Sequence, residues 1–316
     1  MPAVAKAPLE VGVGLRVDQI TSINQKKENF GVVASLMLEW KEPQLATRPD
    51  EDVPPQRIYK ASDFVNMLTE RKLLWPAHSF YNLQGRVDYQ NQFVAVDSQG
   101  NVKYFARFSA AFQAPDFDFT HFPLDTQNFH IKLIALLPTS DIKFKAMTDS
   151  SGLSEELGEE EWILAHTGSK ITTHTSFGIT VPCFILSFQG KRHLNYYIVR
   201  ILVPVIIIIL VSWFTFFLKD YGKRIDLSSG NLLLFIAFNF TIANDLPRLG
   251  YITLMDTFMM ATFGITGLVV LANVWLRRAQ RHGREAFIDR MDDIGVWAYP
   301  LLYIGGGFLV FLMSYL

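Results

Sequence analysis

The strongest constraint on this chain is the change in its polarity near residue 196. Before that point, charged and apolar residues are mixed and no long apolar run occurs. After it, three apolar runs follow, at residues 196–218, 252–276 and 294–316. Because a bilayer core needs about 20 apolar helical residues, each run predicts a membrane-spanning helix. Buried helices of a large water-soluble domain are the alternative, but three such runs crowded into one part of the chain favour a membrane.

A fourth crossing is needed between the first two runs, and residues 224–246 supply it. The orientation follows from the basic residues, which accumulate on the cytoplasmic side of membrane proteins. The loops after the first and third spans are the basic ones, with Lys219, Lys223, Arg224, Arg277, Arg278, Arg281 and Arg284. We therefore expect both loops in the cytoplasm, and the N-terminal domain and the C-terminus outside.

The second span is unlike the others because polar residues recur along it. Six of its residues follow one another at alternating steps of four and three and so share one face of a helix. They are Asp226, Gly230, Leu233, Ala237, Phe240 and Asn244. Polar residues elsewhere around the same helix indicate that protein or water, rather than lipid, surrounds it.

This face predicts the lining of a pore if several copies of the chain assemble around an axis. Asp226 would then form a ring of carboxylates, which favours cations over anions. Leu233 and Phe240 would form apolar constrictions that gate by dewetting. The alternative for Asp226 is a helix N-cap, since Asp is a good capping residue.

Residues 1–195 predict a β-sandwich. Short segments of alternating or β-rich apolar residues are separated by turns, which is typical of two packed sheets. The strand-like segments are 10–20, 32–40, 101–112, 129–137 and 183–188. Only residues 61–75 indicate a helix, with Ser62 as its N-cap.

Composition excludes several function classes. The net charge of −1 gives no basic field for nucleic acid, and a single cysteine, Cys183, permits no intrachain disulfide. No nucleophile, metal-ligand or phosphate-loop motif occurs, so we expect no enzyme and neither cofactor nor metal. The acidic segment 154–162 is expected to be a solvated loop, with a divalent-cation site as the alternative.

The segment PDFDFTHFPLDTQNF, residues 115–129, resembles the signature loop of the Cys-loop receptors, the pentameric ligand-gated ion channels. Its core is FPLDTQ, residues 122–127. Pro115 and Phe129 stand where animal members have cysteines, and the linker between the third and fourth spans is short. Both departures resemble the prokaryotic branch of the family.

The resemblance implies a homopentamer in a bacterial inner membrane. Residues 1–195 would form an extracellular, immunoglobulin-like sandwich of ten strands, and residues 196–316 a four-helix transmembrane domain around a central pore. Membrane lipid, permeating monovalent cations and an extracellular agonist or protons would be its partners.

The resemblance also implies how the two domains communicate. The signature loop, with Phe122 and Pro123, would lie on the membrane domain, and its Asp125 is predicted to pair with Arg192. Pro247 and Arg248 fall in the linker after the pore-lining helix, which must move when that helix tilts. The alternative is that Asp125 and Arg192 only hold the fold together.

An agonist pocket between subunits is implied too, lined by aromatic side chains that attract cationic amines. The candidates in this sequence are Phe80, Tyr81, Tyr104, Arg107, Trp162 and Phe177. Leu136, Ser35 and Leu36 leave the aromatic box incomplete, so a carboxylate bound by Arg107, or protons, compete with an amine. The alternative for each candidate is ordinary sandwich core.

Together these patterns predict a ligand-gated, cation-selective channel. The same channel gated mainly by extracellular pH is one alternative. A non-conducting envelope sensor, whose β-domain binds a ligand without ion flux, is the other.

Overall fold

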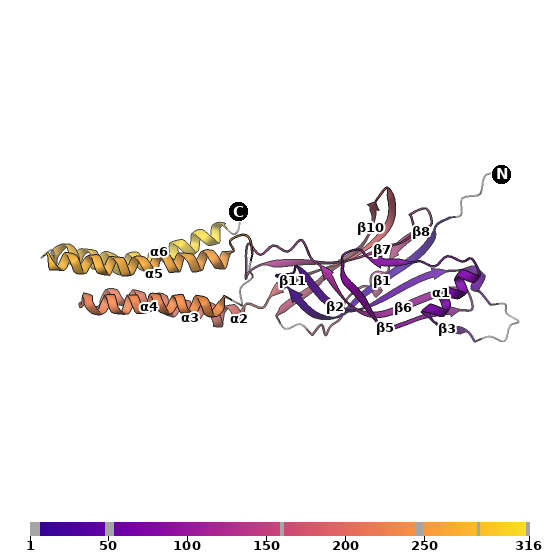
Figure 1. Ribbon diagram of the computed structural model, residues 1–316, viewed down its shortest axis with the longest axis horizontal. Coiled ribbons are helices and arrows are strands. Elements are labelled where there is room, and N and C mark those ends of the chain that lie inside the picture. Colours follow the sequence, from indigo (N-terminus) through magenta and orange to yellow (C-terminus); the bar gives the residue numbers. More distant parts are fainter. Residues whose placement is uncertain (1–6, 48–53, 159–160, 244–248, 283–284, 314–316) are drawn as a thin grey trace. The chain divides into compact units, whose positions relative to one another are not determined.

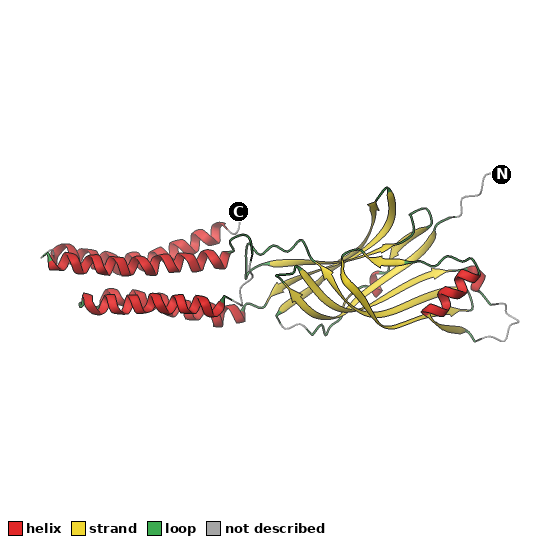
Figure 2. Cartoon of the chain, in the orientation of Figure 1, coloured by secondary structure: helices red, strands yellow, loops and turns green. Residues whose placement is uncertain are grey.

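The structure is a computed structural model that describes residues 7–47, 54–158, 161–243, 249–282 and 285–313 (Figure 1). The chain forms two compact units, residues 1–117 with 126–191 and residues 118–125 with 192–316. The first contains the strands and the second the long helices (Figure 2). Residues 118–125 therefore belong to the helical unit, although strands precede and follow them in the chain. A division into residues 1–195 and 196–316 does not separate this loop from the sandwich.

The first unit is a sandwich of two sheets. One has the strand order β3-β5-β6-β2-β1-β8, with β9 paired to β1, and the other the order β10-β11-β7-β4. The strands are β1 (Leu9–Asn24), β2 (Asn29–Lys41), β3 (Gln56–Lys60), β4 (His78–Phe80), β5 (Leu83–Asp97), β6 (Asn101–Gln113), β7 (Thr126–Ala135), β8 (Ile142–Ala146), β9 (Gly152–Leu153), β10 (Trp162–Ser176) and β11 (Ile179–Arg192). The described residues thus contain eleven strands rather than ten, and β9 is only two residues long.

Alternating burial explains why these segments pair as sheets. In β7, every second residue is buried from Gln127 to Ala135, so one face of the strand enters the core. The two sheets meet in an aromatic cluster: the Phe30 ring of one sheet lies 5.2 Å from Phe129 and 5.6 Å from Phe188 of the other. Phe129, which the resemblance aligns with a cysteine of animal receptors, is therefore held by apolar packing.

The predicted helix forms as α1 (Ala61–Glu70), but the prediction of its cap was wrong. Lys60 is the N-cap residue, and its side chain makes no capping bond, while the Ser62 hydroxyl lies within the first turn, 3.2 Å from the Asp63 carboxylate. The helix ends before residue 75 because Lys72 adopts a positive φ of 54°, which turns the chain.

The described residues of the helical unit form four long helical segments. The first is a series of short helices, α2 (Asn195–Tyr197), a π-helical turn η3 (Ile198–Leu202), α3 (Val203–Phe214) and η4 (Thr215–Phe217). The others are α4 (Tyr221–Ile242), α5 (Leu254–Arg281) and α6 (Glu285–Met313). The π turn ends two residues before Pro204, which has no N–H to continue the regular hydrogen-bond ladder.

Three of these segments are long and apolar enough to cross a membrane: Asn195–Phe217, Tyr221–Ile242 and Leu254–Arg281. The fourth crossing, for which α6 is the candidate, stays a prediction. Both α5 and α6 extend beyond the predicted spans into the basic loop. Arg278 and Arg281 lie in the last turn of α5, where positive charge is favourable next to the free carbonyl groups.

Candidate ion pore and coupling site

The helix α4 begins at a cap that the sequence prediction did not name. Asp220 is the N-cap residue, and its carboxylate accepts hydrogen bonds from the backbone N–H groups of Gly222 and Lys223, at 2.8 and 3.4 Å. Asp226 lies further along the helix. The alternative in which Asp226 caps this helix is therefore wrong.

One face of α4 is open and the opposite face is buried. The residues predicted to line a pore that lie in the described helix are all exposed in the single chain: Asp226, Gly230, Leu233, Ala237 and Phe240. The large apolar residues among them, Leu233 and Phe240, are 66% and 76% exposed. The buried positions are Tyr221, Arg224, Ser228, Asn231, Phe235 and Ile242. Asn244 lies outside the described residues.

Polar side chains on the buried face fasten α4 to its neighbours. The Asn231 side-chain amide donates to the Ile208 carbonyl at 2.8 Å and to the Ser212 hydroxyl at 2.7 Å, both on α3. The Asn273 amide of α5 donates to the Ser228 hydroxyl at 3.4 Å. These polar residues are therefore kept from lipid by protein, as intramembrane polar groups require.

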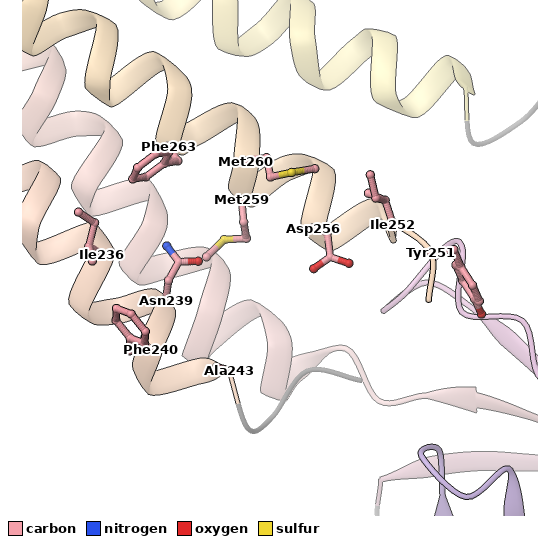
Figure 3. A pocket seen from close by; sticks show the side chains of 10 residues that line it. All are labelled: Ile236, Asn239, Phe240, Ala243, Tyr251, Ile252, Asp256, Met259, Met260 and Phe263. Atoms are coloured by element: carbon pink, nitrogen blue, oxygen red, sulfur yellow. The ribbon is translucent and has the colours of Figure 1, made fainter. Parts of the chain in front are cut away.

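A largely apolar cavity of about 700 Å³ lies between the C-terminal half of α4 and the start of α5 (Figure 3). It adjoins Phe240 of the open face. Side chains of both helices line it, and Asn239 and Met259 point toward one another across it (Figure 3). Asp256 is the charged residue among those that line the cavity, so the cavity is apolar apart from this acidic group, the Asn239 amide and the Tyr251 hydroxyl.

Asp125 and Arg192 lie together as a buried ion pair. Arg192 Nε is 3.0 Å from Asp125 Oδ1, and the two side chains are 0% and 1% exposed. Arg192 Nη1 also donates to the Tyr197 hydroxyl at 3.1 Å, and its guanidinium carbon lies 4.9 Å from the centre of the Phe122 ring. Such a pair fixes residues 118–125 to the chain that enters the first span; its role in gating stays a prediction.

The same loop also binds the start of α5. The Leu254 N–H donates to the Thr120 carbonyl at 2.8 Å, and the Met255 N–H donates to the Phe122 carbonyl at 3.2 Å. These are N–H groups of a first helical turn, which have no acceptor within their own helix. Residues 118–125 thus act as a backbone cap on α5.

Three side chains complete this junction, and sequence reasoning missed all of them. The Tyr251 hydroxyl accepts a hydrogen bond from the Phe119 N–H at 2.9 Å. Thr253 and Asp256 form a reciprocal capping box at the start of α5. The Thr-x-x-Asp spacing before an apolar run was the signal that could have revealed the capping box. Pro123 lies in the loop after a cis peptide bond, whereas Pro247 and Arg248 lie outside the described residues.

Three of the six ligand-binding candidates are buried in the sandwich. Phe80 packs 4.9 Å from Phe108, and Tyr104 packs 5.4 Å from Trp75, measured between ring centres. Trp162 is 3% exposed. These positions agree with the sandwich-core alternative for the three residues.

The other three candidates are exposed. Tyr81 lies against His174 of β10, with ring centres 4.1 Å apart, and Phe177 occupies the two-residue turn between β10 and β11. Arg107 lies on β6 in the other sheet, where its Nε is 3.7 Å from Asp18 Oδ2. Within one chain, then, Tyr81 and the β10–β11 hairpin come together.

Local contacts shift the pKa values of several groups outside the membrane segments. The Thr120 hydroxyl and N–H, which donate to the Asp118 carboxylate, hold its pKa below the usual value. Burial lowers the pKa of His78 and raises that of Tyr104. Within the described residues, no group of three or more His, Cys, Asp or Glu side chains is arranged to hold a metal ion.

Comparison with known proteins agrees with this architecture. Residues 1–189 match the family model described as the neurotransmitter-gated ion-channel ligand binding domain. A proton-gated ion channel of Gloeobacter violaceus is 27% identical over 311 residues, which cover 96% of this chain and 82% of the relative. The gamma-aminobutyric acid receptor subunit rho-2 of Bos taurus is 23% identical over 282 residues, 85% of this chain but only 58% of the relative.

Proposed function

The chain belongs to the family of neurotransmitter-gated, or Cys-loop, ligand-gated ion channels, and we propose that it is a cation-selective member that assembles as a homopentamer. The sandwich would lie outside a bacterial inner membrane, α4 would line the pore, and α6 would provide the fourth crossing with the C-terminus outside. The supporting observation is the open face of α4. This face carries a carboxylate, Asp226, beside Leu233 and Phe240, so it is better suited to face other copies around a water-filled path than to face lipid.

Selectivity would come from the Asp226 carboxylates. Five copies around an axis place like charges close together at the inner mouth, which attracts cations and repels anions. Leu233 and Phe240 would form the apolar closure further out. The cavity beside Phe240 would then be covered in part by a neighbouring subunit.

Gating would be a shift between two populations of the pentamer. A signal that binds the open state better tightens the sandwich, and residues 118–125 transmit the change to α5 and to the linker that follows α4. Moving the pore from 1% to 99% open requires a differential affinity of about 5.5 kcal/mol in total.

Extracellular protons are one candidate for the gating signal, and the similarity to the Gloeobacter relative favours them. It is described as proton-gated and matches nearly the whole chain. A small amino acid is the competing signal, because the rho relatives are receptors for gamma-aminobutyric acid. Tyr81, Phe177 and the Arg107 guanidinium of an adjacent subunit would form its site.

The test is voltage-clamp recording of the expressed chain during extracellular pH steps from about 5 to about 9, a range that includes the histidine titration. Gamma-aminobutyrate is then applied at a constant pH. Reversal potentials in asymmetric potassium chloride separate cation from anion current, and the Asp226→Ala channel should lose cation preference. A reversal potential at the chloride equilibrium value would reject cation selectivity. No current under any condition, from protein present at the cell surface, would favour the non-conducting sensor.

A further inference from the structure

We propose that Asp292 of α6 is a positioning residue for the inner mouth of the pore. It holds Arg224 on the first turns of α4 and so fixes where the Asp226 carboxylate stands. The inference rests on the proposed function, because Asp226 has this role only if α4 lines the pore. It gives α6, which contributes nothing to the predicted pore lining, a direct effect on ion conduction.

The Arg224 side chain is only 2% exposed, and protein groups surround its guanidinium. Its Nη1 and Nη2 atoms donate to the two oxygens of the Asp292 carboxylate at 2.6 and 3.0 Å. Nη2 also donates to the Phe216 carbonyl at 2.7 Å, and Nε donates to the Leu218 carbonyl. This two-pronged pairing fixes the direction of the guanidinium as well as its charge.

Further contacts hold Asp292 and its helix in place. The Tyr221 hydroxyl donates to Asp292 Oδ2 at 2.6 Å, so two side chains of α4 converge on one carboxylate of α6. The next turns of α6 are bound to α3, because Trp213 Nε1 donates to the Val296 carbonyl at 2.9 Å and the Tyr299 hydroxyl donates to the Ile209 carbonyl at 3.0 Å.

The packing of α6 against η4 supports the same arrangement. A Cβ atom added at Gly295 would lie 2.9 Å from the Phe216 ring, so a larger residue at this position would force that ring to shift. Tyr221 also packs in an apolar cluster with Leu276 and Ile288. The guanidinium is thus held beside an apolar cluster, where a buried charge that loses its partner cannot stay without cost.

The polar fastening of α4 is concentrated at this end. Tyr221, Arg224, Ser228 and Asn231 all hydrogen-bond to other helical segments of the unit. The later polar side chains Asn239 and Thr241 instead bond to carbonyl groups of α4 itself. The first turns of α4, with Asp226 two residues beyond Arg224, are therefore the part whose position the rest of the bundle sets.

The test compares Asp292→Asn with Asp293→Asn in the full-length channel. Asp293 is exposed and adjacent, so its substitution removes the same charge without touching Arg224. We expect Asp292→Asn to shift unitary conductance and reversal potential toward those of Asp226→Asn, while Asp293→Asn stays at the wild-type values. Wild-type conductance and reversal potential in an assembled Asp292→Asn channel would overturn the inference.

The Asp226→Asn channel separates the two proposals. If it conducts like wild type, the role of Asp226 in the pore fails and the inference fails with it. If it is altered while Asp292→Asn is not, only the inference fails.

Two further comparisons extend the test, and the first also serves if Asp292→Asn does not reach the cell surface. Tyr221→Phe removes one donor to Asp292 and leaves the ion pair, so it should give a smaller shift in the same direction; unchanged conductance would count against the inference. On an Arg224→Gln background, Asp292→Asn should add no further change in conductance, because Asp292 acts through Arg224. A full additional shift would show that Asp292 acts by another route.

Discussion

Two buried arginines in the helical unit have similar surroundings but different connections. Arg192 and Arg224 are both almost fully buried, each pairs with an aspartate, and each lies over an aromatic ring. Arg192 binds the loop 118–125, which also caps α5, whereas Arg224 binds α6 and the end of η4. The same kind of ion pair thus holds the loop that caps α5 in one place, where we propose that gating movement passes, and holds the first turns of α4 in the other.

The difference teaches that burial of a charge does not by itself reveal its role. A buried pair is not a strong source of stability, since desolvation cancels much of the attraction between the partners. What matters is which segments the pair connects. The following predictions test whether the two pairs act on separate steps, from the largest expected effect to the smallest.

Breaking the first pair should have the largest effect. Arg192→Ala leaves Asp125 buried without its cation, and removing one partner of such a pair typically costs about 3–5 kcal/mol. We expect few channels at the cell surface, measured by surface labelling, and a weak response to the gating signal from those present. Single-channel conductance should stay normal. A normal response at wild-type surface density would mean that the pair transmits nothing.

The apolar constriction should respond independently of both arginines. Leu233→Ala removes most of an apolar side chain that the closed pore would shield from water, and burying a leucine is worth about 1.5–3 kcal/mol. Opening should become easier by roughly tenfold or more, since 1.4 kcal/mol is a factor of ten in an equilibrium constant. Resting current and the midpoint of the dose-response curve measure this. Leu232→Ala, on the less exposed side of the helix, is the matched control.

A histidine in the sandwich should make stability depend on pH. Burial lowers the pKa of His78 in the folded state, so the unfolded chain takes up a proton first as the pH falls below about 6.5. The free energy of unfolding should therefore be constant at higher pH and decrease below that value. His78→Gln should reduce this decrease, as measured by thermal unfolding of the purified channel at pH 7.5 and 5.5. An equal decrease in both proteins would assign the pH dependence to other groups, such as His130.

The smallest effect is expected at the hydroxyl that joins the loop to the segment before α5. Tyr251→Phe deletes the acceptor for the Phe119 N–H, and such a bond contributes about 1 kcal/mol. The midpoint of the dose-response curve should move by roughly fivefold, with conductance unchanged. A change of conductance would instead contradict the assignment of gating to the Arg192 junction and of conductance to the Arg224 site.

Local pattern predicted much of this architecture. All five strand-like segments form strands, and helical segments form over the apolar runs. Both could be predicted because the spacing of apolar residues along a segment indicates which of its faces is buried. The burial of Tyr104 could have been recognised in the same way, since Val102, Ala106 and Phe108 share its face of β6. The family resemblance supplied the pairing of Asp125 with Arg192 across 67 residues.

Contacts between distant segments were the part that the sequence did not reveal. Arg224 was counted only as a basic residue of a cytoplasmic loop, and the packing of α6 on α3 brings Asp292, 68 residues away, to its guanidinium. The carbonyl groups of Thr120 and Phe122 cap α5. The sequence does not predict this capping, because every residue supplies a carbonyl group.

The central claim is that the open face of α4 lines the ion path, and cysteine accessibility tests it most directly. Cys183 is the only cysteine and is buried, so the background reaction should be low. A small cationic thiol reagent applied to activated Leu233→Cys channels should block the current, whereas Phe235→Cys, on the buried face, should not respond. Reaction at Phe235→Cys with none at Leu233→Cys would contradict the account.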